Sequence, residues 1–194
     1  MKRLLLLCVL SFLLIYVAGV TGCKNSSQKE NAVSPQTSVS LKEGDYTFED
    51  SVAGWNALGK EVSVSQSTEK FHDGKASLKI SGTGKAGVYS FLRSDRIPLS
   101  PGKHYTFKGW MLIDSISSKN ADFKLELHQE GKWLQNIETT QYDVGKKGTW
   151  QELSGKFAAP TGKDVAVSIC VEKAYDEDVN AVIYVDALSL QKAD

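Results

Sequence analysis

Short runs of alternating apolar and polar residues fill most of this chain, and turns containing glycine or proline separate them. No window shows the sustained spacing of three and four residues that marks an amphipathic helix. A two-residue period predicts strands with one buried face, because successive side chains of a strand point to opposite faces of a sheet. About ten short strands at near-regular spacing predict an all-β fold, either an antiparallel two-sheet β-sandwich or a barrel. The runs are 45–49, 61–66, 76–81, 87–92, 104–113, 122–129, 133–140, 150–157, 165–172 and 181–190.

The N-terminal end has the layout of a secretory signal. Lys2 and Arg3 precede an apolar run from Leu4 to Val20, and the tetrapeptide VTGC follows. This ending resembles the lipobox of bacterial lipoproteins, which implies that residues 1–22 are a signal peptide and that Cys23 carries lipid. An uncleaved membrane anchor is the alternative, for which the run is at the short end. We expect a lipid anchor in a bacterial membrane, with the remainder of the chain facing the periplasm or the cell exterior.

The segment that follows the cysteine predicts a flexible tether over residues 23–45. It is rich in serine, contains no aromatic residue and has few large apolar ones, so it cannot bury enough surface to fold. Residues 46–192, about 147 residues, then form one domain with a core of its own. Cys170 is the one cysteine in that domain, which excludes a disulfide within it, and its strand-like surroundings predict a small buried side chain.

The charge balance argues against a nucleic-acid partner. The chain has 23 basic and 23 acidic residues, and loss of Lys2 and Arg3 with the signal leaves a charge of about −2. Nucleic-acid-binding domains usually concentrate positive charge, which this composition does not provide.

Five segments in order resemble jelly-roll carbohydrate-binding modules of the galactose-binding-like type, as found in carbohydrate-binding families four, nine and twenty-two. They are YTFEDSVAGWNALG (46–59), KFHDGKASLKIS (70–81), LSPGKHYTFKGWMLI (99–113), GTWQELSGKFAAP (148–160) and AVIYVDALSL (181–190). The resemblance covers essentially the whole domain. It implies a jelly-roll sandwich that binds polysaccharide or oligosaccharide in a cleft on one sheet, without catalysis.

The resemblance also gives the aromatic residues of the domain a role, because in these modules aromatic rings stack on sugar faces in the cleft. Trp110 is the first candidate, since its parity is opposite to that of Tyr105, Phe107 and Met111, which we expect in the core. Either Trp110 is held out for a sugar, or a loop or the N-terminal segment covers it. Trp133 is its expected companion, with polar residues around both. If the strands concerned share a sheet, one groove is lined by Lys108, Trp110, Lys124, Glu126, His128, Trp133 and Gln135.

A structural calcium ion is the second feature that the resemblance implies. In the family it is held by an acidic residue of the first strand, carbonyls of the next loop and an aspartate of the last strand. The matching positions are Glu49, the loop around Asp73 and Lys75, and Asp186. Calcium prefers six to eight oxygen ligands, which carbonyls in a glycine-containing turn help to supply.

Nothing in the sequence has the pattern of a catalytic centre. There is no nucleophile elbow, zinc-binding HExxH, phosphate-binding loop or dinucleotide fingerprint, and the three histidines are scattered. We therefore expect a non-catalytic glycan-binding lipoprotein, acting near separate glycoside hydrolases because no catalytic domain follows within these residues. The alternative is a protein-interaction or assembly module of the cell envelope that keeps the sandwich without binding sugar. Exposure of Trp110 and Trp133 on one face would favour the first.

Overall fold

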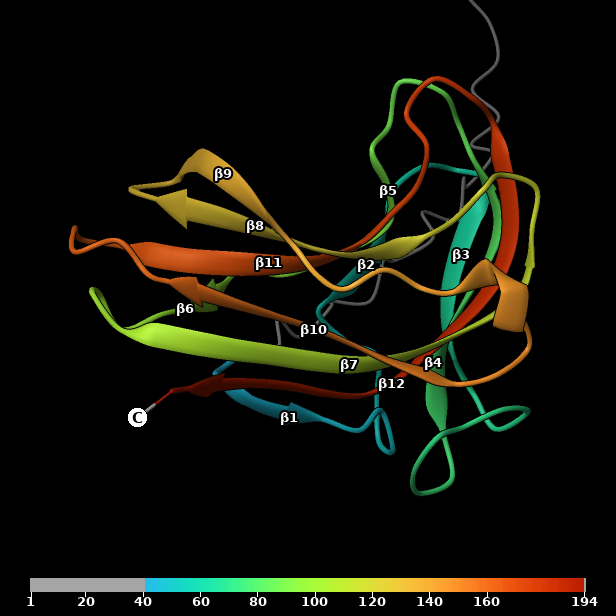
Figure 1. The fold of residues 1–194 in the computed structure, drawn as a ribbon, viewed down its shortest axis with the longest axis horizontal. Helices are drawn as coiled ribbons and strands as arrows, with labels where there is room; N and C mark the ends of the chain where they lie inside the picture. Colours follow the sequence, from blue (N-terminus) through green and yellow to red (C-terminus); the bar gives the residue numbers. More distant parts are fainter. Residues whose placement is uncertain (1–40, 194) are drawn as a thin grey trace, which may run out of the picture. The chain divides into compact units, whose positions relative to one another are not determined.

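The computed structural model describes residues 41–193, in which twelve strands form two antiparallel sheets (Figure 1). Sheet A has the order β10 (Gln151–Ala158), β7 (His104–Ile116), β12 (Val179–Lys192), β4 (Ser77–Gly84) and β3 (Val62–Ser67), and β1 (Gly44–Tyr46) also pairs with β12. Sheet B has the order β2 (Trp55–Ala57), β5 (Ser90–Ser94), β11 (Val165–Glu172), β8 (Asp122–Gln129) and β9 (Lys132–Glu138), and β6 (Ile97–Pro98) pairs with β11. A 3₁₀ turn, η1 (Val144–Lys146), connects β9 to β10.

The core lies between the two sheets. In β7, Tyr105, Phe107 and Met111 are buried as their parity predicts. Phe107 meets Phe123 of β8 edge to face, with ring centroids 5.3 Å apart, so the two sheets contact each other directly. Each aromatic side chain buried in this way contributes about 2–3 kcal/mol to the free energy of folding.

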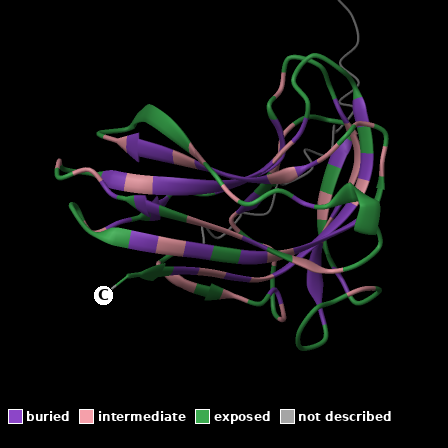
Figure 2. Cartoon of the chain, viewed as in Figure 1, coloured by how far each residue is buried: buried purple, intermediate pink, exposed green. Residues whose placement is uncertain are grey.

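Sheet B positions the residues of the candidate functional site. Strands β8 and β11 pair without a break from Val165↔Gln129 to Glu172↔Asp122, so the faces of β8 are fixed. Phe123, Leu125 and Leu127 point to the core, and the residues between them point outward. Figure 2 shows that β9, at the edge of this sheet, is exposed along most of its length.

The all-β, two-sheet sandwich predicted from the sequence is confirmed, and each of the ten predicted runs overlaps a strand. The sequence missed β2 and β6, which have three and two residues and are too short to show a period. The buried position of Cys170 is confirmed, and burial raises the pKa of its thiol to about 12.

The start of the domain differs from the prediction. Leu41 is buried against Gly54, and β1 begins at Gly44, so residues 41–45 of the segment predicted as a tether pack on the sandwich. The predicted signal peptide 1–22, the lipidated Cys23 and the tether as far as residue 40 lie outside the described residues. Between residues 41 and 193, no helix is both long and apolar enough to cross a membrane.

Candidate functional site

The residues predicted to line one groove belong to two different sheets. Lys108 and Trp110 lie on β7 of sheet A, whereas Lys124, Glu126 and His128 lie on β8 of sheet B. Trp133 and Gln135 follow on β9, also in sheet B. The prediction of a single groove is therefore wrong, because the chain passes from sheet A to sheet B between β7 and β8.

Trp110 lies on the outer face of sheet A, where a loop covers it. The imidazole of His72 stacks on the indole of Trp110, with ring centroids 3.8 Å apart and planes inclined by 15°. Trp150 meets the same imidazole edge to face at 5.8 Å. Trp110 is half-buried, so of the two alternatives the structure shows the covered one. Lys108 on the same face is exposed and lies 3.8 Å from the carboxylate of Glu152, away from sheet B.

Asp186 and Glu49 hold that covering loop in place. Asp186 is completely buried opposite Trp110, and its Oδ2 accepts hydrogen bonds from the backbone N–H groups of His72 (2.8 Å) and Asp73 (3.0 Å). Burial raises the pKa of Asp186, and these donors lower it in part. Glu49 Oε1 accepts from the N–H groups of Lys75 (3.0 Å) and Ala76 (3.1 Å). The two carboxylates thus attach one loop to the rest of the sandwich.

These contacts fit a calcium ion only in part. The two acidic residues do reach the same loop, but they meet its N–H groups, and N–H groups cannot ligate a cation. Asp73 accepts its own hydrogen bond from the N–H of Gly74 at 2.8 Å. Among the described residues, no group of three or more His, Cys, Asp or Glu side chains could hold a metal ion. The calcium site stays a prediction.

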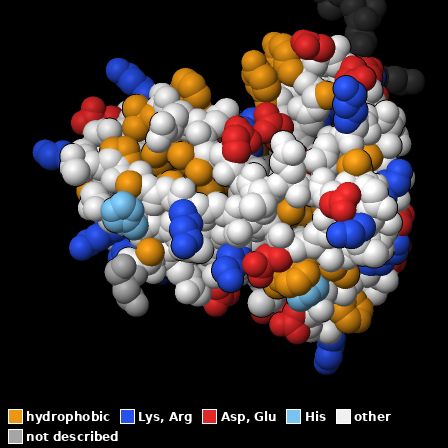
Figure 3. Space-filling view, in the orientation of Figure 1, with side chains coloured by type: hydrophobic (Ala, Val, Ile, Leu, Met, Phe, Trp, Pro, Cys, Tyr) orange, Lys and Arg blue, Asp and Glu red, His pale blue; other side chains and the backbone are white. Residues whose placement is uncertain are grey.

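The outer face of sheet B carries a groove of about 500 Å³, which we call the sheet B groove. Figure 3 shows the molecule hollowed at the top of the view, between the part that carries β8 and β9 and the loops that precede β5 and follow β11. A volume of this size is typical of small-molecule sites. The groove is lined by Tyr89, Arg93, Lys124, Glu126, His128, Trp133 and Asn136.

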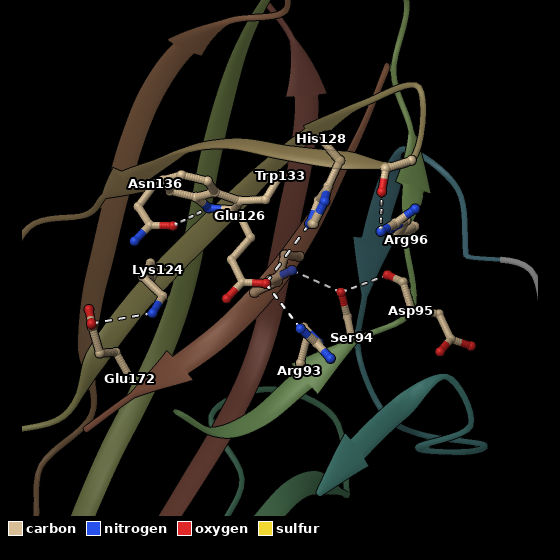
Figure 4. Close-up of polar contacts among 12 residues, drawn as sticks. Arg93, Ser94, Asp95, Arg96, Lys124, Glu126, His128, Trp133, Asn136 and Glu172 are labelled. Atoms are coloured by element: carbon tan, nitrogen blue, oxygen red, sulfur yellow. Dashed lines mark hydrogen bonds and ion pairs between the residues drawn. The ribbon is translucent and has the colours of Figure 1, made fainter. Parts of the chain in front are cut away.

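A bulge in β9 decides which of its residues face the groove. His128 pairs with Trp133 and Leu127 with Gln135, so Leu134 is an extra residue that reverses the alternation. Trp133 and Asn136 therefore face the groove, and the indole N–H of Trp133 donates a hydrogen bond to Asn136 Oδ1 at 3.0 Å (Figure 4). Gln135 lies on the other face, so its predicted place in the groove is wrong.

Trp133 is the most exposed large apolar side chain in the described part of the chain, with 58% of its surface accessible. Tyr89 is similarly exposed and stacks on Tyr175, with centroids 4.2 Å apart and planes 23° apart. Aromatic rings held open in a groove offer flat apolar surfaces that the core does not use. A further hollow of about 710 Å³ lies next to this aromatic pair, since Tyr175 is among its lining residues.

A buried lysine supports the middle of the groove. Lys124 is 1% exposed, and its Nζ lies 3.3 Å from Glu172 Oε1 and 5.1 Å from the centre of the Tyr89 ring. Burial, and next the charge of Glu172, raise the pKa of Glu138 on the neighbouring strand. Lys124 thus partly neutralises the carboxylates of Glu172 and Glu138.

His128 lies at the other end of the groove, where it is 6% exposed and neither ring nitrogen has a hydrogen-bond partner. Its Nε2 is 3.9 Å from Glu126 Oε2, which is too far for a hydrogen bond. Glu126 in turn lies 3.4 Å from Nη1 of Arg93 on β5 (Figure 4). Burial, and next the positive charge of Arg96, lower the pKa of His128.

Sequence reasoning placed Trp133, Glu126, His128 and Lys124 correctly on one face, and it missed three groove residues. Simple alternation places Asn136 on the face opposite to Trp133, since it takes no account of the bulge. Tyr89 and Arg93 flank the apolar part of β5, and the run predicted as 87–92 ended one residue before Arg93. The one sequence feature that could have pointed to Arg93 is its positive charge directly after the apolar residues Phe91 and Leu92.

Comparison with known proteins identifies the class. The model of a family described as a carbohydrate binding domain matches residues 44–178, which is more than half of the chain. The chain belongs to this carbohydrate-binding domain family.

Individual relatives agree with the family. Endo-1,4-beta-xylanase A of Thermotoga maritima is 31% identical over 124 residues, and the same enzyme of Thermotoga neapolitana is 27% identical over 119 residues. Both matches cover 61% of this chain but only 11% of the enzyme, so the chain spans about a tenth of the length of these relatives.

Two solved structures share the fold. The xylan-binding CBM22-1 domain from Paenibacillus barcinonensis Xyn10C has a TM-score of 0.57 at 19% identity, with 78% of this chain and 97% of that chain covered. The CBM22-1–GH10 modules of Clostridium thermocellum xylanase 10B, described in complex with xylohexaose, have a TM-score of 0.56 at 18% identity. That match covers 78% of this chain and 28% of the other.

Proposed function

We propose that the sheet B groove binds a polysaccharide of the xylan type without catalysis. The observation that carries the proposal is the exposed Trp133, held by Asn136 in a groove whose other lining residues are mostly polar or charged. A pyranose ring presents C–H groups to a flat aromatic face, and this contact buries apolar area without requiring hydrogen-bond donors. Glu126, Asn136 and Arg93 are then available to the hydroxyl groups at the edge of the sugar.

Xylan is the favoured glycan because relatives of this chain are named for it. Two are endo-1,4-beta-xylanases, one similar structure is a xylan-binding domain, and another was described with xylohexaose bound. Xylose carries no charge and no hydroxymethyl group, so a ligand of this class relies on ring stacking and hydroxyl contacts, which are the two kinds of surface that the groove offers.

We also propose that lipid on Cys23 anchors the domain to a bacterial membrane, facing the periplasm or the cell exterior. The VTGC motif supports this proposal. One groove of this size binds weakly, and many copies on one membrane would raise the avidity through effective concentration. Xylan held in this way would be presented to glycoside hydrolases on separate chains.

A protein-interaction module is the second candidate. Tyr89, Trp133, Leu134 and Tyr175 are exposed together around the groove, and aromatic residues are enriched at protein interfaces as well as at sugar sites. A partner protein that competes with xylan for the groove would favour this reading.

A structural calcium ion is part of the proposal for the opposite sheet. Support comes from Glu49 and Asp186, which reach the same loop from near the first strand and from the last. Differential scanning calorimetry in excess calcium and in excess chelator tests it. We expect a midpoint a few degrees higher in calcium, because a ligand that binds only the folded state stabilises it. Equal midpoints would remove calcium from the proposal.

The binding proposal is tested by calorimetric titration of the full-length chain, purified in detergent, with xylohexaose and cellohexaose. We expect saturable binding of xylohexaose, and no new reducing ends after prolonged incubation with xylan. Absence of binding to either oligosaccharide would contradict the proposal and favour the protein-interaction module. Release of reducing ends would contradict its non-catalytic part.

A further inference from the structure

The sheet B groove continues into a second, more polar hollow of about 330 Å³, which we call the arginine pocket. The two share Arg93 and His128 as lining residues, so the two hollows adjoin each other. The remaining lining residues of the arginine pocket come from β2 and the residue that follows it, from β5, from the β5–β6 segment and from β11. They are Asn56, Leu58, Ser94, Asp95, Arg96 and Ser168.

The two guanidinium groups of the arginine pocket are weakly engaged. Nη2 of Arg96 donates to the carbonyl oxygen of Gly131 at 3.0 Å, and no carboxylate of the described residues lies within ion-pair distance of it. Arg93 has one carboxylate neighbour, Glu126, at 3.4 Å. A guanidinium has five N–H donors in a planar fork, so both side chains have donors to spare.

The acidic residue of the arginine pocket does not neutralise Arg96. Asp95 is exposed and accepts a hydrogen bond from Asn56 Nδ2 at 2.8 Å. Figure 4 shows its carboxylate directed away from Arg93 and His128. Glu126 lies next to Arg93 and His128 in the sheet B groove. The positive charge that remains in the arginine pocket is therefore that of Arg96.

His128 gives a second, independent sign of a ligand. It is more than nine-tenths buried, it lines both hollows, and both its ring nitrogens lack partners. Buried polar groups normally have hydrogen-bond partners, and an unsatisfied imidazole is costly. An acceptor placed between His128 and the two arginines would take a hydrogen bond from its ring N–H.

We propose that the arginine pocket binds the carboxylate of an acidic sugar, a uronic acid carried as a side group on the polysaccharide. This inference rests on the proposed glycan binding of the sheet B groove and names its substrate class. A carboxylate matches the guanidinium fork in two parallel hydrogen bonds, and such charge-assisted bonds are about twice as strong as neutral ones. The neutral main chain would lie along Trp133, with its acidic branch in the arginine pocket.

The test compares three ligands on the full-length chain in detergent, by isothermal titration calorimetry at low salt. They are a xylo-oligosaccharide bearing one glucuronic acid branch, the same oligosaccharide bearing a neutral arabinose branch, and free glucuronate. We expect the acidic branch to bind about tenfold more tightly than the neutral one, as one charge-assisted hydrogen-bond pair gives. Free glucuronate should bind at least a hundredfold more weakly than the acidic oligosaccharide, because it leaves the sheet B groove empty.

Arg96→Gln is the variant that isolates the arginine pocket, because Arg96 does not line the sheet B groove. It should remove the tenfold preference and leave the affinity for the arabinose-branched ligand within twofold. Lys108→Gln removes the same charge from the outer face of sheet A and should retain the preference.

The pH dependence provides a second readout. Arg93, Arg96 and Glu126 face His128, and a bound carboxylate adds a negative charge that favours the imidazolium form. Affinity for the acidic ligand should therefore rise as pH falls from 7.5 to 5.5, while affinity for the neutral ligand stays flat.

Equal affinities for the acidic and neutral branches would overturn the inference and leave the proposed xylan binding intact. Failure of every oligosaccharide to bind would overturn both. Free glucuronate as potent as the acidic oligosaccharide would overturn the polysaccharide side group as the source of the carboxylate.

Discussion

Two tryptophans on the outer faces of the two sheets have opposite surroundings. Trp110 of sheet A is covered by the His72 loop, whereas Trp133 of sheet B stands open beside a groove. Both follow the same kind of strand pattern, an aromatic ring among polar neighbours. The difference comes from a loop that buried Asp186 and Glu49 tie down over one face. Whether an outward-facing ring is available to a ligand thus depends on a loop attached elsewhere in the chain.

Releasing that loop should lower the free energy of unfolding more than any other change considered. Asp186→Ala removes a buried acceptor and leaves the N–H groups of His72, Asp73 and Ala187 unpaired, so we expect a loss of about 3 kcal/mol in the free energy of unfolding. Urea denaturation measures this. Asp45→Ala, at an exposed position, is the matched control and should change stability by less than about 0.5 kcal/mol. Equal effects of the two variants would contradict the role of Asp186.

A smaller loss of stability is expected from Trp110→Ala. The ring is half-buried between the sheet and His72, so its removal should cost about 1–3 kcal/mol in the free energy of unfolding. Trp133→Ala should cost less than about 1 kcal/mol, since most of that ring is already in water. Chemical denaturation measures both losses, and a larger loss for Trp133→Ala than for Trp110→Ala would contradict the assignment of Trp110 as the covered ring.

The pH dependence of stability also distinguishes the two sheets, because His128 lies on sheet B. The pKa of His128 in the folded protein is held below its ordinary value of 6.5, so the unfolded chain binds a proton first as pH falls. Stability contributed by the neutral imidazole is therefore present above pH 6.5 and is lost as pH falls toward the folded pKa, by up to about 1.4 kcal/mol per pH unit. His128→Gln should flatten this decline between pH 6.5 and 5, and the exposed His104→Gln should not. Parallel curves of stability against pH for the parent chain and both variants would contradict the role of His128.

The smallest effect concerns the bulge in β9. Asn136→Ala removes the partner of the Trp133 indole and should weaken glycan binding about three- to tenfold, the effect of one hydrogen bond. Gln135→Ala, one residue earlier on the other face, should change affinity by less than twofold. Titration with xylohexaose measures both, and a larger effect of Gln135→Ala would show that the register is wrong.

The strands and the core could be predicted from the sequence more accurately than the groove. Alternation identified Tyr105, Phe107 and Met111 as core residues because burial of one face imposes a period of two. Alternation states which face a side chain occupies but not which sheet its strand joins. Trp110 and Trp133 were therefore grouped, although their strands β7 and β9 belong to different sheets.

The remaining errors have equally local causes. One extra residue at Leu134 exchanged Gln135 for Asn136, because a bulge reverses every side chain beyond it. Arg96 and the arginine pocket depend on a contact between segments far apart in the chain, which no short pattern encodes. The resemblance to carbohydrate-binding modules supplied the expectation of a groove, and the fold supplied its position.

The proposed glycan site lies on the sheet B face and not on the sheet A face. Affinity electrophoresis in gels with and without xylan tests it most directly, on the full-length chain and its Trp133→Ala and Trp110→Ala variants, with near-ultraviolet circular dichroism as the check of folding. We predict that xylan retards the parent chain and a folded Trp110→Ala variant, and that Trp133→Ala migrates as in the empty gel. Retardation of Trp133→Ala together with its loss in a folded Trp110→Ala variant would contradict the account and move the site to sheet A.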